Sequence, residues 1–379
     1  MTRSAPPRVL ITPHNEENPY LPLLGKALSE VGVVSDWLRM EWTPSQTLNG
    51  LLLPIELTLH RLRGFNVLHL HWSYRFGWYW SRRLPLVRSL PRRWFGFSLW
   101  FAGVIGFRIV YTSHEPLPLA PVFDDDVAGR SPLFRRSRVI ITITEAAKEY
   151  LVEGFGVDPA RVEVIPEGPP MVAHQTERAP ARTRLGVSAT TPLLAMFGHI
   201  DSYKGADLLL EAVLQLPPTT RLSIRLLGAS GNPQYANKLE DLVRRLEGQG
   251  RDVRWKRGAF SDEDLDVLLA ATDFVVIPFR LITNSSSMRV AMARRVPLLV
   301  PDLPELVDIP ATALFRYDRT LEGGLREGLN SILHATPDDI AARVAAAYEW
   351  TTAWTWHAVG LATKAIYERA LLQDLNGRR

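Results

Sequence analysis

The sequence predicts an α/β protein with two doubly wound domains, each a parallel sheet covered by helices on both faces. Its 379 residues suit two domains of roughly 150–200 residues better than one core. Short runs rich in Val, Ile and Leu alternate with amphipathic helical patterns, as parallel strands buried on both faces do. A polar stretch at 173–192 interrupts this alternation once, and the alternation then resumes.

Five apolar runs precede the polar stretch and five follow it. The first set predicts strands at 8–12, 66–72, 107–114, 138–144 and 162–166, and the second at 193–198, 222–228, 253–258, 274–279 and 297–301. From about residue 319 the pattern is helical, and its tryptophan cluster is typical of core packing. We therefore expect domains at 1–172 and 193–350, a linker at 173–192, and a C-terminal helix at 351–379 that packs back across the seam.

Composition excludes several classes of function. The chain has no cysteine, which excludes disulfides, thiolate metal sites and cysteine nucleophiles. A net charge of +4 is too small to indicate nucleic-acid binding, so no nucleic-acid partner is expected. The first residues contain no apolar run long enough for a signal peptide. We therefore expect a cytoplasmic protein.

One lysine stands out because only six of the 44 basic residues are lysines. Gly198, His199, Lys204 and Gly205 lie between a predicted strand and a helix, where ligands of doubly wound sheets bind. A helix N-terminus carries unpaired N–H groups and partial positive charge, and glycine lets a ligand approach the backbone. These features suit a phosphate. A solvated lysine on an ordinary turn is the alternative.

A second helix start follows the predicted strand at 274–279. Its polar turn is Thr283, Asn284, Ser285, Ser286 and Ser287. The first three are preferred helix caps, and one cap needs fewer hydroxyls than this turn supplies. The surplus could bind an anion, although serine as loop filler explains it too. Two such helix starts in one domain suggest a pyrophosphate held between them.

The order of these motifs resembles a known family. The stretches "FGHIDSYKGADLLLEA", "RWKRGAFSDEDLDVLLAATDFVVIPF" and "AMARRVPLLV" are similar to the donor half of the retaining family-4 glycosyltransferases, which have the GT-B fold. In the front half, "NVLHLHW", "RIVYTSHEP" and "VEVIPEG" resemble the acceptor domain of that family. The likeness covers about residues 8–370. It implies a nucleoside-diphosphate sugar as co-substrate, no bound cofactor, and a saccharide or lipid-linked acceptor.

The resemblance also implies roles for donor-site residues. Lys204 would clasp the diphosphate together with His199, which stands where the family usually has arginine and whose charge depends on pH near neutrality. The family carries two glutamates near the second helix start, where this chain has Ile282 and Val290. The turn at 283–287 would then take over diphosphate binding. The nucleobase pocket would be lined by Gly228, Arg257, Gly258 and Phe260.

In the front domain the resemblance assigns His114 a contact with the transferred sugar near the reaction centre. His69 and His71 alternate with Leu70 and so share one face of a strand. His71 is nearer the strand end and is expected to face the acceptor, whereas His69 is expected in the core. The remaining acceptor-binding candidates are Glu17, Tyr20 and Trp72, with Glu16 beside them.

Asp124 and Asp126 form a D-x-D pattern that some other glycosyltransferases use for a divalent ion. Those enzymes have a different, single-domain fold, and here the pattern lies in a proline-rich loop. We expect a solvated loop and no metal requirement.

Residues 72–108 contain seven Arg, five Trp and no acidic residue. The uncharged run at 94–107 is shorter than the roughly 20 residues of a membrane-spanning helix, and a buried helix is the plain alternative. Mixed Arg and Trp suit an anionic membrane interface. We therefore expect peripheral attachment at the inner face of the cell membrane.

These patterns together favour a retaining glycosyltransferase of polysaccharide or glycoconjugate synthesis. The missing glutamates leave three alternatives open. The chain could be an inverting GT-B transferase with a carboxylate or histidine base, a non-catalytic GT-B-like binding subunit, or a sugar-nucleotide epimerase.

Overall fold

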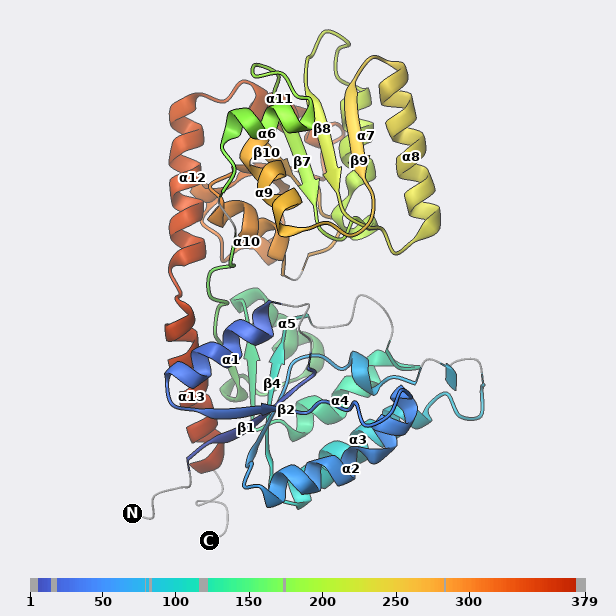
Figure 1. The fold of residues 1–379 in the computed structure, drawn as a ribbon, viewed down its shortest axis with the longest axis vertical. Helices are drawn as coiled ribbons and strands as arrows, with labels where there is room; N and C mark the ends of the chain where they lie inside the picture. Colours follow the sequence, from blue (N-terminus) through green and yellow to red (C-terminus); the bar gives the residue numbers. More distant parts are fainter. Residues whose placement is uncertain are drawn as a thin grey trace. The chain divides into compact units, whose positions relative to one another are not determined.

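The chain forms two compact α/β units (Figure 1). The computed structural model describes residues 6–14, 19–78, 80–81, 84–115, 122–172, 175–282 and 284–372. The first unit comprises Met1–Gly168 with Trp354–Arg379, and the second comprises Pro169–Ala353. The first unit is therefore discontinuous in sequence.

The first unit contains a six-stranded parallel sheet in the order β2-β1-β3-β4-β5-β6. Its strands are β1 (Arg8–Thr12), β2 (Val34–Trp37), β3 (Val67–Leu70), β4 (Arg108–Ser113), β5 (Val139–Thr142) and β6 (Val162–Val164). Its helices are α1 (Tyr20–Glu30), α2 (Gln46–Leu62), α3 (Leu90–Val104), α4 (Asp126–Arg136), α5 (Glu145–Phe155) and α13 (Trp356–Leu372).

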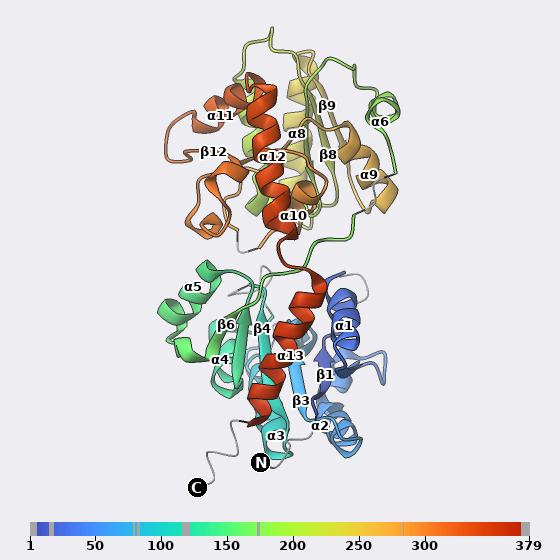
Figure 2. The ribbon, with the colours of Figure 1, turned by 90° about the vertical axis from the view of Figure 1, so that its left-hand side faces the viewer.

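Alternate side chains of β1 point to opposite faces of this sheet. Val9 and Ile11 pack in one apolar cluster with residues of α1 and α13, and Leu10 packs in another with residues of α2 and α3. Helix α13 lies along the sheet next to α1 and β4 (Figure 2). The end of the chain thus completes the core of the unit that its beginning forms.

The second unit contains a six-stranded parallel sheet in the order β12-β11-β10-β7-β8-β9. Its strands are β7 (Leu193–Phe197), β8 (Ser223–Leu227), β9 (Asp252–Lys256), β10 (Phe274–Val276), β11 (Leu298–Pro301) and β12 (Phe315–Tyr317). Its helices are α6 (Arg178–Leu185), α7 (Ala206–Leu214), α8 (Pro233–Gly248), α9 (Asp262–Ala271), α10 (Ser286–Ala293), α11 (Gly324–Leu333) and α12 (Pro337–Thr352).

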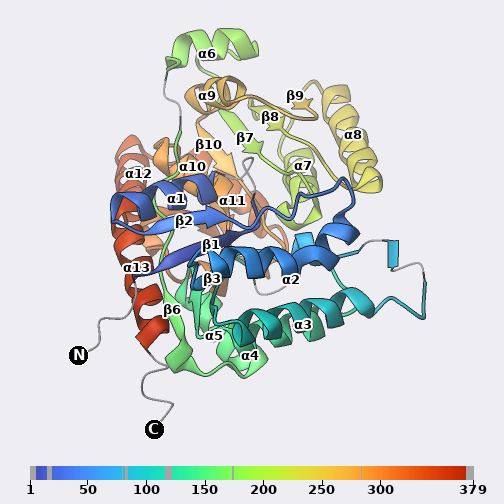
Figure 3. The ribbon, with the colours of Figure 1, turned by 60° about the horizontal axis from the view of Figure 1, so that its bottom comes forward.

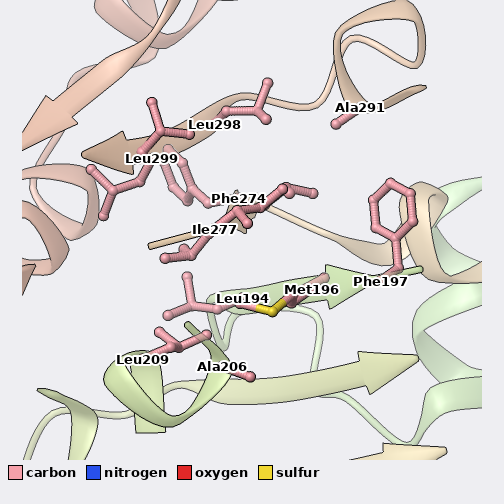
Figure 4. Close-up of a cluster of buried hydrophobic side chains, with 14 of the residues drawn as sticks. Leu194, Met196, Phe197, Ala206, Leu209, Phe274, Ile277, Ala291, Leu298 and Leu299 are labelled. Carbon is pink, nitrogen blue, oxygen red and sulfur yellow. The ribbon is translucent and has the colours of Figure 1, made fainter. Parts of the chain in front are cut away.

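The core of the second unit lies between the central strands and their helices. Figure 4 shows Met196 and Leu194 of β7 beside Leu209 of α7, with Phe274 and Leu299 of the neighbouring strands. Strand order reverses between β7 and β10, because β8 and β9 follow β7 on one side and β11 and β12 follow β10 on the other. In doubly wound sheets this reversal marks the ligand crevice.

All ten predicted strands are present, and two further strands, β2 and β12, had no prediction. Each lies at an edge of its sheet. β2 has no fully buried residue, and β12 is only three residues long. Neither therefore carries the continuous apolar run that marks a strand buried on both faces.

The predicted linker at 173–192 is wrong in its bounds. This stretch contains α6, which packs on α9 of the second unit. Arg182 is buried there, and its guanidinium donates to the carbonyl oxygen of Ala271 (2.8 Å) and to Asp273 (3.0 Å). The polar composition suggested a linker, but three arginines of α6 form ion pairs with carboxylates of the second unit. The C-terminal helix α13 belongs to the first unit.

Candidate functional site

The second unit places Lys204 at the point where its strand order reverses. Lys204 ends a short 3-10 turn after β7, and Ser287 lies in the first turn of α10, after β10. The Lys204 ammonium donates to the carbonyl oxygen of Phe197 and to Oγ of Ser287, both at 2.8 Å. The two helix starts singled out in the sequence therefore meet at one lysine.

Lys204 is 4% exposed, and burial lowers the pKa of its amine from 10.5 to about 7. The third N–H of this ammonium has no partner among the described residues. A desolvated cation with spare donor capacity gains from an anion, because the anion restores the charge stabilisation that burial removes. The site is therefore suited to phosphate oxygens.

Gly198 brings the backbone directly against this lysine. A Cβ added at Gly198 would lie 2.8 Å from Nζ of Lys204 and 2.9 Å from Oγ of Ser287. Its φ of +90° also disfavours other residues. Gly205 is constrained likewise, with φ +75° and a Cβ position 2.1 Å from the carbonyl oxygen of Pro278. The backbone at Gly198 therefore lies against an ammonium and a hydroxyl, where a side chain would not fit.

His199 lies on the exposed side of this loop. Its Nε2 is 2.6 Å from Asp201, whose other oxygen accepts from Ser230 Oγ (2.7 Å) and the Gly231 amide (3.1 Å). Asp201 therefore ties the loop after β7 to the loop after β8. Sequence reasoning missed this aspartate, although it lies inside the stretch that contains Lys204.

The serines of the second turn have different roles. Ser285 caps α10 by accepting from the Met288 amide (3.2 Å), Ser286 is exposed, and Ser287 contacts Lys204. Asn284 is partly buried. Thr283 lies outside the described residues. The turn therefore supplies two serine hydroxyls, those of Ser286 and Ser287, beyond the one that caps the helix.

The residues predicted around a nucleobase divide into two groups. A Cβ at Gly228 would lie 1.9 Å from the carbonyl oxygen of Gly198, so Gly228 packs directly on the lysine loop. Arg257 instead pairs with Glu240 (2.8 Å), which occupies its guanidinium. Gly258 has φ +115° and open space around it, and Phe260 packs partly buried against the core.

At the two positions where the family has glutamates, this chain has apolar side chains that lie in apolar surroundings. Ile282 is buried in the core, and Val290 packs against the core. One buried carboxylate of this unit is Asp207, on α7. Burial alone would raise its pKa, but hydrogen bonds from Arg280, Lys238 and Tyr235 hold the pKa below its usual value. This carboxylate is therefore committed to structure.

In the first unit four predicted residues gather at the carboxyl end of the sheet. The ring of His114, after β4, stacks on Trp72 (4.2 Å between centroids) and meets the edge of Tyr20 (4.6 Å). Nδ1 of His71 is 3.1 Å from Nε2 of His114. His71 is fully buried, which lowers its pKa, and its Nε2 has no partner among the described residues.

Glu167 joins this group and was missed by the sequence reasoning. Its carboxylate lies 3.6 Å from Nδ1 of His114, so Glu167, His114 and His71 form one chain of contacts. The available signal was its place just after β6, where ligand-facing residues gather. His69 is buried as expected, between Tyr367 Oη (2.6 Å) and Thr112 Oγ1 (2.8 Å), and burial lowers its pKa to about 3.

Glu16 and Glu17 lie outside the described residues. In the D-x-D pattern Asp124 is exposed, as expected of a solvated loop, and Asp126 is partly buried. Asp124 pairs with Arg92 (3.0 Å), and Asp126 accepts from the amides of Val122 and Phe123. Within the described ranges, no three His, Asp or Glu side chains are placed to hold a metal ion.

Residues 9–169 match a family model described as Glycosyltransferase Family 4. This range spans the contiguous part of the first unit, from β1 to the end of the segment that carries Glu167. The contiguous part of the first unit is therefore similar to this family over nearly all of its length. Its histidine–tryptophan cluster lies inside the matched range.

Curated relatives extend the likeness along the chain. A D-inositol 3-phosphate glycosyltransferase of Xylanimonas cellulosilytica is 30% identical over 196 residues, which are 48% of this chain and 43% of that protein. One of the same name from Kineococcus radiotolerans is 28% identical over 232 residues, 58% of this chain and 50% of that protein. The chain thus spans about half the length of these relatives.

Solved structures match both units of the chain. Sucrose-phosphate synthase from Thermosynechococcus elongatus has a TM-score of 0.69 at 18% identity, covering 96% of this chain and 99% of that one. Anabaena HepE in complex with UDP has a TM-score of 0.70 at 14% identity, covering 96% and 100%. Two parallel six-stranded sheets and these likenesses show the GT-B fold.

Proposed function

We propose that this chain is a glycosyltransferase that moves a sugar from a nucleoside-diphosphate donor to a saccharide or lipid-linked acceptor. The observation that carries the proposal is the buried Lys204 at the strand-order reversal, with the backbone of Gly198 packed against it. The relatives named as glycosyltransferases support the same reaction class.

The donor's diphosphate would bind beside Lys204, against the backbone of Gly198. As the bond between the sugar and the diphosphate breaks, negative charge grows on the departing phosphate oxygens. Lys204 and the amides opening α10 are fixed in place before the reaction and would stabilise that charge. His199, held by Asp201, would add a second cation at its exposed edge. In this proposal Lys204, His199 and the amides of α10 supply the charge stabilisation, and we propose that the reaction needs no metal ion.

The histidine cluster of the first unit would orient the transferred sugar and the acceptor. His114 presents a ring backed by Trp72 and tied to Glu167 and His71. We propose a retaining transfer, as the family likeness favours. The pair of His114 and Glu167 supports a second candidate, because a histidine oriented by a carboxylate is the base that an inverting transfer requires. The anomeric configuration of the product, read by NMR, decides between them.

A thermal-shift screen with UDP-, GDP- and ADP-sugars tests the donor site. A true donor at 100 times its Kd should stabilise the folded state by about 2.7 kcal/mol and raise the melting temperature by several degrees. The matching donor should then be turned over, in buffer with EDTA, when candidate acceptors are added. Absence of both stabilisation and turnover with all three nucleotides would refute the proposal.

Glu167→Gln is expected to lower kcat by about tenfold while donor KM changes little, because the variant loses a charge beside His114 but keeps its shape. Initial rates across a pH series should also show a displaced profile. Glu163→Gln is the matched control, since Glu163 lies in β6 and pairs with Arg369 of α13 (2.6 Å) instead of with His114. A Glu167→Gln profile that overlays that of the control would contradict the role.

We also propose that the protein acts at the cytoplasmic face of the cell membrane, in peripheral contact with anionic lipid. None of the helices in the described ranges has the length and apolar character needed to span a bilayer. A lipid-linked acceptor would be met at such a surface.

A further inference from the structure

Helices α2 and α3 of the first unit lie side by side (Figure 3), and both expose apolar side chains. On α2 these residues recur every three or four positions, as one stripe does on a helix, and are Leu48, Leu51, Ile55, Leu59 and Leu62. On α3 they are Leu90, Phe97, Trp100 and Val104. The opposite sides of the same helices fill the core, so both helices are apolar on two faces. The outer apolar face is exposed to water, and an exposed apolar patch of this kind marks an interaction surface.

The segment that carries these two helices is almost free of acidic residues. Residues 46–114 contain nine arginines, no lysine and one acidic residue, Glu56. Glu56 is 4% exposed and accepts from the amides of Arg39 and Met40, so it faces inward. The exposed part of these helices is therefore both apolar and cationic.

A groove between α3 and α4 lies on the rim of this surface. Its volume is about 440 Å³, and arginines from both helices line it, namely Arg92 and Arg93 from α3 and Arg135 and Arg136 from α4. Phe97 and Trp100 form its apolar side. The helices approach closely at its floor, because a Cβ at Gly96 would lie 3.3 Å from Pro132.

The arginines of the groove are unequally neutralised. Arg92 pairs with Asp124 (3.0 Å), while Arg93 and Arg136 have no carboxylate partner among the described residues. Arg135 contacts only the hydroxyl of Ser131. Three guanidinium groups around one groove thus lack a counter-ion, and planar guanidinium groups bind phosphate through paired donors.

We propose that the α3–α4 groove binds the head group of an anionic phospholipid while the apolar stripes of α2 and α3 enter the bilayer surface. The arginines would hold the phosphate, and Phe97 and Trp100 would contact the first carbons of the acyl chains. Arg–Trp surfaces of this kind suit the boundary between head groups and acyl chains. This inference deepens the proposed membrane contact but needs no glycosyl transfer.

Flotation of the full-length protein with vesicles tests the groove. Vesicles of phosphatidylcholine mixed with phosphatidylglycerol should carry the protein at low salt, and phosphatidylcholine alone should carry much less. Losing two unpaired cations in the double variant R93Q/R136Q should lower the partition coefficient about 30-fold. The control R221Q/R245Q removes two exposed arginines of the second unit and should float like wild type.

A second pair of variants tests the apolar part. F97S/W100S should abolish flotation even on the mixed vesicles, whereas V307S/L321S, which changes exposed side chains of the second unit, should not. Circular dichroism melts confirm that each variant is folded. Equal binding to both vesicle types, or a dimer by light scattering that F97S/W100S dissociates, would overturn the proposal. Because these assays contain no donor, their failure is separate from failure of the transferase activity.

Discussion

Lys204→Ala is expected to lower kcat/KM for glycosyl transfer by about 100- to 1000-fold, the usual effect of removing one preorganised donor from developing negative charge. The truncated side chain also leaves Ser287 Oγ and the Phe197 carbonyl without their cation. Stability should change little by comparison, because removing a desolvated ammonium offsets the lost hydrogen bonds. Initial rates and melting temperatures measured on the same preparations separate the two effects.

The lowered pKa of Lys204 gives this prediction a pH signature. Between pH 7 and 10.5 the unfolded chain binds a proton at this amine that the folded chain does not, so the ligand-free protein gains stability as pH rises through this window. A bound diphosphate should raise the pKa of the amine. Donor binding above pH 7 should therefore take up a proton, which calorimetry in buffers of different ionisation enthalpy measures.

Lys204→Met is the control for that linkage, since it fills the site without a titrating group. Proton uptake should disappear in this variant. Uptake that persists unchanged, or kcat/KM within threefold of wild type (~0.6 kcal/mol), would show that the diphosphate is not bound at Lys204.

Gly228→Ala is expected to destabilise the second unit by about 3 kcal/mol or more. The added Cβ would lie 1.9 Å from the carbonyl oxygen of Gly198, which is backbone and has no rotamer with which to move aside. The φ of +136° adds strain of its own. Because Gly198 packs against Lys204, the displacement should also weaken nucleotide binding. Urea unfolding and a nucleotide titration measure the two effects.

Two glycine controls separate clash from backbone strain. At Gly258 the φ is +115° and nothing lies near the Cβ position. Gly258→Ala should therefore lower the free energy of unfolding by only about 1–3 kcal/mol. Gly248→Ala lies at the end of a helix with open space, and it should be neutral or stabilising by up to about 1 kcal/mol. Equal destabilisation by Gly228→Ala and Gly258→Ala would mean that the close approach to Gly198 is absent.

Much of the fold was predictable because parallel strands buried on both faces leave continuous apolar runs. The edge strands β2 and β12 were missed since they carry no such run. At the candidate site, Lys204 was found from its position between a strand and a helix. The burial of its amine was not predictable, because it depends on Ser287, 83 residues later in the chain.

Glu167 shows the same limit in the first unit. A glutamate after a short strand has no distinguishing pattern, and only folding brings its carboxylate to His114. Arg257 differs. Its guanidinium pairs with Glu240 of α8, whereas the predicted nucleobase contact involves the backbone around Arg257 and stays a prediction. Local sequence indicates which residues reach a sheet edge, and tertiary contacts decide whether they remain available there.

The return of α13 to the first unit has a consequence for biosynthesis. During translation the sheet containing β1 leaves the ribosome long before α13, which covers one of its faces together with α1, and Val9, Ile11 and Val110 lack part of their cover meanwhile. The second unit, contiguous from Pro169 to Ala353, can finish folding first. A stop codon near residue 354 should therefore damage the half of the protein made earliest and spare the half made last.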